Sequence, residues 1–278
     1  MKPAAFSYHR PTTMAEALGA LAELGEDGKV LAGGQSLVPM MSMRIAQPDA
    51  LVDINFVGDF PQLEVDNNAV RVGALVRQGE LERSPAAATA CPLLGQALSH
   101  VSHAAIRNRG TVVGSLAHAD PASELSTVLL LLGGSVAAAS TAGTREIAAS
   151  DLFTGLYQTT LRPDELVVSA RFPRINGGAR TAFLEVARRH GDFALCAVGA
   201  LVEGASARVA IAGLEGVPCV LDVSEAFGSG GERVIDEKIG ALGARSDIHA
   251  SGDFRRHLAS TLVRRALTAA RNGEEERE

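Results

Sequence analysis

The stretch VLAGGQSLVPMM, residues 30–41, begins as an apolar strand and then reaches two adjacent glycines. Such a strand end has two interpretations. The glycines can form a tight structural turn, or they can let successive backbone N–H groups surround an anion such as a phosphate. Gly33, Gly34, Gln35 and Ser36 make up this loop, and the loop alone does not distinguish the two interpretations.

A second glycine-rich loop, GTVVGS, occupies residues 110–115. Glycines again permit a close approach of the backbone to a ligand, and the hydroxyl groups of Ser36, Thr111 and Ser115 add possible donors. Two loops that converge on one pyrophosphate would explain both stretches, whereas each loop by itself is more simply a structural turn.

The sequence around the first loop predicts a small α/β unit. In TTMAEALGALAELGEDGK, Thr13 and Glu16 form a capping-box pattern, apolar residues follow at helical spacing, and Gly25 stands where a helix ends. The segments KVLAGG (29–34) and ALVDI (50–54) then read as buried strands. A helix between short apolar strands favours parallel pairing.

Beyond residue 60 the pattern predicts more strands and helices, then a polar, glycine-rich boundary at PRINGGAR (173–180). After this boundary three alternating segments indicate an antiparallel meander, two helices close the chain, and the tail NGEEERE is expected to be frayed. The predicted strands lie at 69–76, near 135–140, near 165–172 and within 181–189, 194–204 and 207–214. The predicted helices lie within 91–106, at the apolar end of 107–132, near 232–243 and near 253–272.

The composition excludes several classes of protein. A net charge of −6 argues against a nucleic-acid partner, which would require clustered basic residues. The longest apolar run, STVLLLLGGSVAAA, is interrupted by glycines and too short to span a bilayer, and the first residues lack the apolar region of a signal peptide. Cys91, Cys196 and Cys219 are too few and too dispersed for a four-thiolate cluster or a disulfide framework, so we expect a cytoplasmic protein.

Common cofactor and metal motifs are missing from the sequence. No GxGxxG pattern opens a helix after the first strand, and neither a phosphate-binding P-loop nor an HExxH motif occurs. The seven histidines are scattered. We therefore expect no metal site in this chain and assign no catalytic acid or base.

Three segments carry a resemblance to a known family. LAGGQSLVPMMSMRIAQPDALVDI, IRNRGTVVGSLAHADPASEL and the later RRHGDFALCAVGA resemble the FAD-binding (medium) subunit of molybdenum hydroxylases. This family includes the medium subunit of carbon monoxide dehydrogenase and the flavin portion of xanthine dehydrogenase. The order and separation of the segments match over nearly the whole chain. AGGQSLVP followed by LVDI is more similar to the branch that contains carbon monoxide dehydrogenase and N-heterocycle hydroxylases.

The resemblance implies an α+β fold of the vanillyl-alcohol-oxidase (PCMH) type. Residues 1–176 would form the FAD-binding domain, with subdomains of about 1–57 and 58–176 that hold FAD between them. Residues 177–278 would form a C-terminal domain with an antiparallel sheet and helices, similar to that of the carbon monoxide dehydrogenase flavoprotein. The boundary agrees with the polar segment at 173–180.

The resemblance also implies which residues contact FAD. The first loop would wrap the pyrophosphate and the second would close on it. Glu124 matches an acidic position that contacts the cofactor, Leu161 an apolar residue on the isoalloxazine ring, and Phe193 an aromatic position near the ring, although an ordinary core role for Phe193 is equally open. The full predicted set is Ala32, Gly33, Gly34, Gln35, Ser36, Leu37, Thr111, Val113, Gly114, Ser115, His118, Asp120, Glu124, Leu161 and Phe193.

One position departs from the family pattern. Where many relatives carry a lysine that reaches toward the flavin, this chain has Glu185. A positive charge near the ring would stabilise the anionic reduced flavin, and a carboxylate would disfavour it. The redox potential and the electron acceptor therefore stay open.

The implied function is electron transfer within a larger complex. In the family a large subunit carries a molybdopterin cofactor, a small subunit carries two [2Fe–2S] clusters, and FAD in the medium subunit passes electrons to NAD, oxygen, a quinone or another acceptor. The family usually forms a dimer of heterotrimers. Two alternatives are a free-standing flavin oxidoreductase of the same fold and a non-catalytic protein in which the glycine loops are only turns. The organic substrate is not encoded in this chain.

Overall fold

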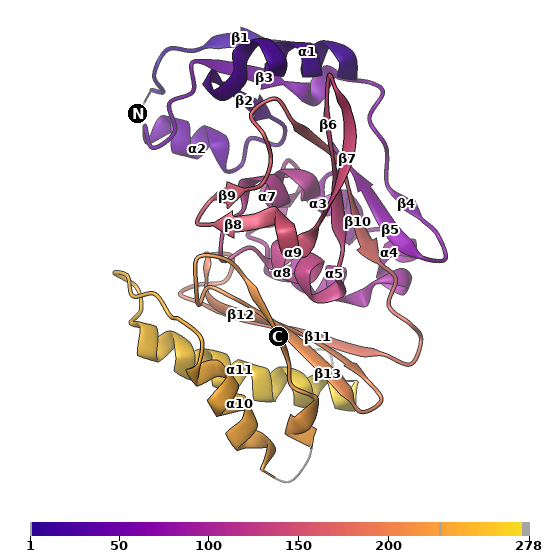
Figure 1. Ribbon diagram of the computed structural model, residues 1–278, viewed down its shortest axis with the longest axis vertical. Helices are drawn as coiled ribbons and strands as arrows, with labels where there is room; N and C mark the ends of the chain where they lie inside the picture. The colour runs from indigo at the N-terminus through magenta and orange to yellow at the C-terminus, as the bar shows by residue number, and fades with distance from the viewer. Residues whose placement is uncertain (1, 228–229, 274–278) are drawn as a thin grey trace.

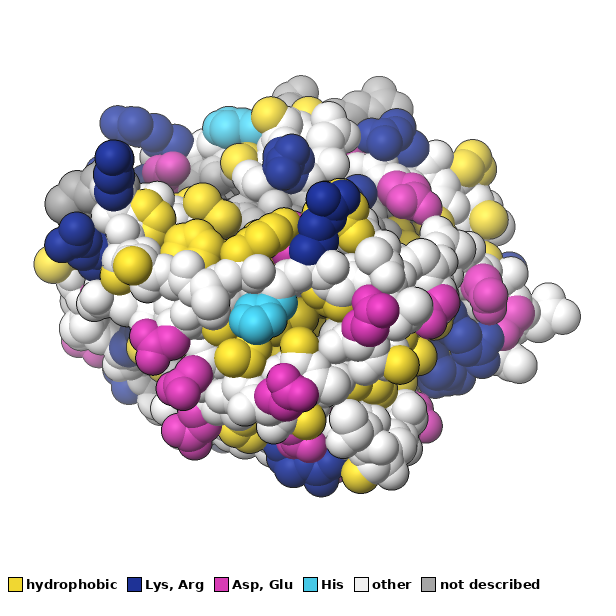
Figure 2. All heavy atoms as spheres, turned by 90° about the horizontal axis from the view of Figure 1, so that it is seen from above, with side chains coloured by type: hydrophobic (Ala, Val, Ile, Leu, Met, Phe, Trp, Pro, Cys, Tyr) yellow, Lys and Arg dark blue, Asp and Glu magenta, His cyan; other side chains and the backbone are white. Residues whose placement is uncertain are grey.

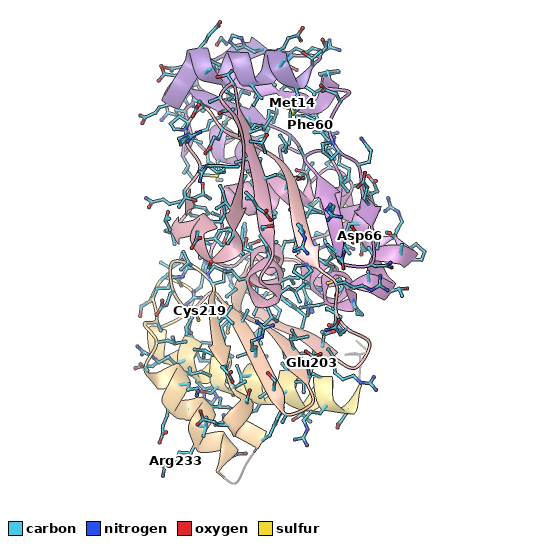
Figure 3. All side chains as sticks on the ribbon, turned by 45° about the vertical axis from the view of Figure 1, so that its right-hand side comes forward. Met14, Phe60, Asp66, Glu203, Cys219 and Arg233 are labelled. Carbon is cyan, nitrogen blue, oxygen red and sulfur yellow. The ribbon has the colours of Figure 1, made fainter. Side chains whose placement is uncertain are left out.

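Three hydrophobic cores follow one another along the long axis of the computed structural model, which describes residues 2–227 and 230–273 (Figure 1). We refer to the surrounding segments as the N-terminal unit (2–60), the central unit (64–173) and the C-terminal unit (180–273). Met14 and Phe60 mark the N-terminal core at one end, and Cys219 lies in the C-terminal core toward the other (Figure 3). The predicted class, a mixture of helices and sheets, is confirmed.

The N-terminal unit is a three-stranded parallel sheet of order β1-β3-β2 covered by α1. The predicted capping box is present, because the Thr13 side chain accepts from the Glu16 backbone N–H and the Glu16 carboxylate returns to the Thr13 backbone N–H. The parallel pairing of the two predicted strands is confirmed, while β1 was not predicted. The elements are β1 (Ser7–His9), α1 (Met14–Leu24), η1 (Gly25–Asp27), β2 (Gly28–Leu31), α2 (Leu37–Ser42), β3 (Ala50–Asp53) and η2 (Ile54–Phe56).

The central unit contains a five-stranded sheet of order β4-β5-β10-β6-β7 with helices packed against it. Two predicted elements end earlier than expected. The strand predicted over 69–76 stops at Gly73, and the helix predicted to continue to Ile106 ends at His100, because the backbone of Ser102 enters the left-handed region at φ 44°. The elements are β4 (Glu64–Val65), β5 (Ala69–Gly73), α3 (Gln78–Glu82), α4 (Pro85–Ala90), α5 (Pro92–His100), α6 (Ala104–Arg107), α7 (Val112–His118), α8 (Glu124–Leu132), β6 (Ser135–Ser140), β7 (Gly143–Ala148), α9 (Ala149–Leu152), β8 (Phe153–Gly155), β9 (Gln158–Thr159) and β10 (Leu166–Pro173).

The C-terminal unit is an antiparallel meander of order β11-β12-β13-β14, which confirms the predicted meander. Alternate side chains along its strands pack into two different hydrophobic cores. Phe183 and Ala197 face the central unit, whereas Leu184 and Val198 face the C-terminal core formed with α11. The elements are β11 (Arg180–Ala187), β12 (Ala194–Glu203), β13 (Ser206–Ala212), β14 (Cys219–Asp222), η3 (Ser224–Phe227), α10 (Gly231–Gly240) and α11 (Gly252–Asn272).

The sheet of the C-terminal unit thus forms a wall against α8 of the central unit. We call this contact between α8 and the C-terminal sheet the seam. Among the described residues, no helix is both long and apolar enough to cross a membrane. Most of the acidic tail lies outside the described residues.

Replacement of Thr13 by alanine tests the N-terminal capping box. Thr13→Ala removes the acceptor for the Glu16 backbone N–H, so the free energy of unfolding should fall by about 1 kcal/mol. Urea titration followed by circular dichroism measures this change. Ser150→Ala is the control, because the Ser150 hydroxyl contacts only the neighbouring Asp151 among the described side chains. Equal midpoints for the two variants would contradict the role of the cap.

Candidate flavin site

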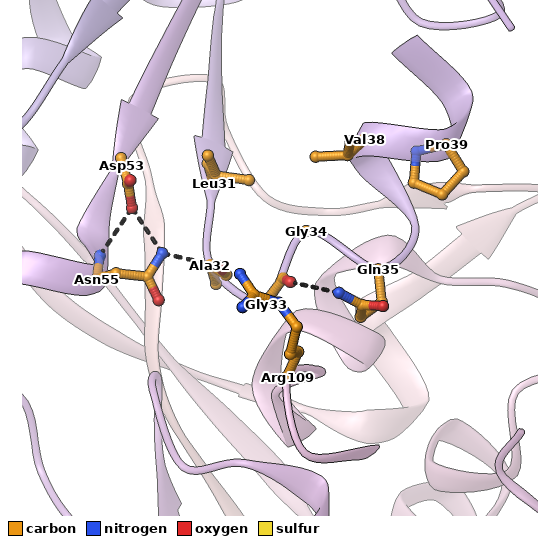
Figure 4. Close-up of a pocket in the computed structure, with 10 residues that line it drawn as sticks. All are labelled: Leu31, Ala32, Gly33, Gly34, Gln35, Val38, Pro39, Asp53, Asn55 and Arg109. Carbon is orange, nitrogen blue, oxygen red and sulfur yellow. Dashed lines mark hydrogen bonds between the residues drawn. The ribbon is translucent and has the colours of Figure 1, made fainter. Parts of the chain in front are cut away.

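A pocket of about 350 Å³ lies where β2 and β3 end (Figure 4). Ligands of open parallel sheets commonly bind at the carboxyl ends of the strands, because the loops there leave a crevice. The first glycine loop forms one wall of the pocket and the start of α2 forms another. The lining residues are Leu31, Ala32, Gly33, Gly34, Gln35, Val38, Pro39, Asp53, Asn55 and Arg109.

The backbone of the first loop offers free donors. Gly34 has φ 73°, a conformation that favours glycine, and its carbonyl accepts from the Val38 N–H as α2 begins. Within the described residues, the backbone N–H groups of residues 33–36 donate to no acceptor. Successive free N–H groups around a turn form a concave nest that suits an anion. Besides forming the turn into α2, the loop therefore leaves these four N–H groups available to an anion.

Gly33 lies directly against the second loop. A Cβ atom on Gly33 would come within 2.4 Å of the Arg109 carbonyl oxygen, 2.8 Å of the Gly110 Cα and 3.0 Å of the Thr111 nitrogen. The two glycine loops are thus in backbone contact, as their predicted convergence requires. This contact, rather than room for a ligand, is the direct reason for glycine at position 33.

The second loop is held by the turn that follows β5. Gln78 N–H donates to the Gly110 carbonyl at 2.9 Å, and Val112 N–H donates to the Val76 carbonyl at 3.2 Å. Thr111 caps α7, since its hydroxyl accepts from the Gly114 N–H at 3.1 Å. The loop is therefore fixed at both ends before any ligand binds.

A polar network joins the N-terminal unit to this second loop. Tyr8 donates to Asp53 at 2.6 Å, and Asn55 donates to Asp53 at 2.6 Å and to the Ala32 carbonyl at 2.8 Å. Arg77 then spans the gap, donating to Asn55 Oδ1 and to the Arg109 carbonyl, each at 2.7 Å. The hydrogen bond to Asp53 raises the pKa of Tyr8, because it is strongest while the phenol keeps its proton.

Past the second loop the chain enters an acidic region. Ser115 and Ser123 lie 3.2 Å apart through their hydroxyl groups. The His118 ring packs against Tyr157 with centroids 5.1 Å apart, and burial lowers the pKa of His118, which favours the neutral imidazole. Burial, followed by the charge of Asp120, raises the pKa of Tyr157. Both rings thus lie within the electrostatic influence of Asp120.

Two carboxyl groups extend this region toward the C-terminal sheet. Glu124 stands in the first turn of α8, and burial raises its pKa to about 7, with a further contribution from Asp120. Burial raises the pKa of Glu185 on β11 to about 9, and the neighbouring Glu124 adds to the shift. Burial therefore disfavours the ionised form of both carboxyl groups.

The structure brings most of the predicted residues into one continuous path. Loop 32–36 touches loop 110–115, and the Ser115–Ser123 contact leads on to Glu124. Val113 is buried in the central core, so only its backbone can reach a ligand. Leu161 packs against the same core, and the described contacts do not join it to the loops. Phe193 is 77% exposed, which excludes the core role considered for it.

Several residues of the site were not predicted from the sequence. Asp53, Asn55 and Arg109 line the pocket, as do Val38 and Pro39. Asp53 and Asn55 carried a usable signal, because polar residues directly after a buried strand point to the ligand-binding edge of a parallel sheet. Nothing in the local sequence distinguishes Tyr8 or Arg77, whose partners are distant in the chain.

Comparison with known proteins identifies the class. The family model described as "FAD binding domain in molybdopterin dehydrogenase" matches residues 4–175, and the chain belongs to this family. It is accordingly an FAD-binding, medium-type subunit of an oxidoreductase, and the resemblance stated from the sequence is confirmed.

Individual relatives cover almost the full length of the chain. The nicotine 6-hydroxylase medium subunit of Paenarthrobacter nicotinovorans is 38% identical over 97% of this chain and 99% of its own length. The carbon monoxide dehydrogenase medium chain of Hydrogenophaga pseudoflava is 31% identical over 97% of this chain and 98% of its own. In the solved carbon monoxide dehydrogenase from Hydrogenophaga pseudoflava, one chain superimposes with a TM-score of 0.90 at 30% identity, covering 97% of this chain and 98% of that one.

Substitution of Gly33 tests the contact between the loops. In Gly33→Ala the added methyl group meets the Arg109 carbonyl, and relief of this overlap costs about 1–3 kcal/mol. The dissociation constant for FAD should rise about 5- to 150-fold. Titration of the FAD-depleted chain with FAD, followed by flavin fluorescence, gives the value. Gly19→Ala is the matched control, because a Cβ at Gly19 in α1 meets open space. Unchanged affinity in Gly33→Ala would refute the contact's role.

Arg77→Met tests the bridge between the units. The variant keeps an unbranched side chain of similar length but loses the bonds to Asn55 and to the Arg109 carbonyl. Hydrogen bonds of charged donors contribute about 1.5–3 kcal/mol each, so FAD should bind at least about tenfold more weakly. The same fluorescence titration applies. Arg71→Met, which breaks only the exposed ion pair with Asp66, should leave the affinity unchanged; an equal loss in both variants would show a non-specific effect.

Proposed function

We propose that this chain receives electrons from the iron–sulfur clusters of a partner subunit through its bound FAD and passes them to an external acceptor. In this proposal a large partner subunit carries the molybdopterin cofactor and reacts with the organic substrate. The observation that carries the proposal is the backbone nest of residues 33–36 locked against the second glycine loop. This arrangement supports tight binding of a pyrophosphate-containing cofactor without any Rossmann-type motif.

We assign the parts of the site to the parts of FAD as follows. The free N–H groups of loop 32–36 would hold the pyrophosphate, and Arg109 at the edge of the pocket would add a positive charge. Thr111 and Ser115 would close from the second loop. The path toward Glu124 would place the isoalloxazine ring at the seam with the C-terminal sheet, in reach of Leu161. Bound FAD supplies the two-electron redox chemistry, while the protein supplies position and electrostatics.

The cysteines support a division of labour between subunits. Cys91, Cys196 and Cys219 are free thiols, and burial raises the pKa to about 12 for the first two and to about 11 for Cys219. Iron–sulfur clusters need thiolate ligands grouped at one place. The described parts of the chain offer no such group, so the clusters that feed FAD would reside in a partner.

Exposed apolar side chains support assembly with partners. Ile248 is 94% exposed and Ile45 is 67% exposed, in addition to Phe193. The end of the molecule formed by the N-terminal unit also shows apolar side chains gathered between charged ones (Figure 2). Large exposed apolar residues often mark interaction surfaces. We therefore propose contacts with a large and a small subunit, in a dimer of heterotrimers; the cytoplasmic location stays a prediction from the dispersed cysteines.

A rapid-mixing experiment tests the direction of electron flow. A small iron–sulfur subunit that forms a complex with this chain is reduced with dithionite, freed of excess reductant and mixed with the FAD-loaded chain in the absence of the large subunit. Flavin absorbance should bleach as the cluster absorbance returns, with one flavin reduced per two electrons delivered. The proposal would be overturned if the flavin stayed oxidised after mixing with the reduced small subunit but was reduced by a small organic donor added to the chain alone. That result would favour a free-standing flavin oxidoreductase.

A further inference from the structure

Two carboxyl groups meet in the seam between α8 and the C-terminal sheet. Glu185 lies in the middle of β11 opposite Ala197 of β12, on the strand face that also carries Phe183. Since Phe183 and Ala197 belong to the central core, this face looks toward the central unit, where α5 packs against β11 and α8, which begins at Glu124, packs against β12. The strand alternation therefore directs Glu185 away from the C-terminal core and into the central unit, where the charge of Glu124 acts on it.

Glu185 is poorly suited to carry a charge in this seam. Its Oε2 atom is buried and has no hydrogen-bond partner among the described residues. A buried ionised carboxylate without a partner is expensive, and the group lowers this cost by keeping its proton. The neighbouring apolar residues Leu184 and Val186 offer no donor from their side chains.

The charges that face the pair are acidic. Glu124 acts on Glu185, and Asp120 acts on Glu124, in each case disfavouring ionisation. Tyr157 is neutral at physiological pH, because burial and Asp120 raise its pKa, and the lowered pKa of His118 leaves that ring neutral.

On the far side of the sheet the titratable groups near Glu185 are the thiol of Cys196 and the guanidinium of Arg255, which already has hydrogen-bond partners. Burial raises the pKa of Cys196 to about 12, so this side chain stays a neutral thiol. The Arg255 guanidinium donates to Asp247 Oδ2 and to the backbone carbonyls of Leu195 and Gly213. On the central side His100 of α5 lies against Phe183, with ring centroids 5.7 Å apart. The charge that acts on Glu185 is that of Glu124, and this favours single ionisation of the pair.

We propose that Glu124 and Glu185 form a carboxyl pair that retains one proton at neutral pH, held mainly on Glu185, and thereby sets the charge beside the flavin ring. One negative charge rather than two then faces the ring, which lessens the opposition to the reduced cofactor. The pair lies at the end of the path that leads from the glycine loops, so its effect on the flavin rests on the proposed function. The retention of the proton does not depend on the proposed function.

The first arm of the test measures stability and needs no flavin. The raised pKa of Glu185 means that the folded chain binds this proton more tightly than the unfolded chain. The resulting stabilisation is complete below the ordinary glutamate value and is lost as the pH rises toward about 9. Urea unfolding of the full chain should therefore show wild type losing up to about tenfold per pH unit in its folded-to-unfolded ratio, relative to Glu185→Gln, over this window.

Glu203→Gln provides the matched control for this arm. Glu203 is exposed at the end of β12, so its loss should leave the pH dependence of wild type intact. Identical pH profiles for wild type and Glu185→Gln would overturn the proposal, because a purely structural glutamate shifts stability equally at all pH values. The double variant with Glu124→Gln and Glu185→Gln should also lose the pH dependence of stability that Glu124 still causes in the single variant Glu185→Gln.

The second arm measures the midpoint potential of FAD bound to the same variants. Near neutral pH Glu185→Gln should match wild type, since the amide imitates the protonated acid. As the pH rises through the titration of Glu185, the wild-type potential should fall below that of the variant. Coincident potentials at all pH values would overturn the effect on the flavin. A chain that binds no FAD would defeat the proposed function instead, and the stability arm would still decide whether the pair holds its proton.

Discussion

The contact of the Gly33 backbone with residues 109–111 is the constraint on which the rest of the site depends. It fixes the edge of a parallel sheet against a loop of the central unit at a distance that excludes any Cβ atom at Gly33. Gly33, Gly34 and Gln35 line the adjoining pocket, and their backbone N–H groups donate to no acceptor among the described residues. Arg77 secures the contact, because its two hydrogen bonds connect the same two units.

Local signals made much of the fold predictable from the sequence. The capping box of Thr13 and Glu16 marks the start of α1 in the sequence. The meander of the C-terminal unit is predicted by segments of alternating apolar and polar residues separated by polar turns. The glycine loops were recognisable as possible ligand loops for the same reason. The six-residue α2 and the three-residue β1 were not predicted, since elements this short leave no periodic pattern.

The remaining features depend on contacts between distant parts of the chain. Tyr8 and Asp53 are 45 residues apart, and Arg77 reaches Arg109 over 32 residues. No spacing rule connects such pairs. Glu185 shows the limit most clearly. Its residue type predicts an ordinary carboxylate, and only its buried position near Glu124 shows that its pKa is raised. Ionisation depends on surroundings that the local sequence does not contain.

The two ends of the site use opposite electrostatics, and this separation has a functional consequence. Backbone N–H groups and Arg109 suit the negative pyrophosphate, whereas the seam near Glu124 is acidic. Affinity for the cofactor can therefore be set at the loops without fixing its potential. In the proposed arrangement, a basic residue in place of Glu185 would change the charge beside the ring while the contact at Gly33 stays intact. Subunits of one family could by this route serve acceptors of different potential with the same binding loops.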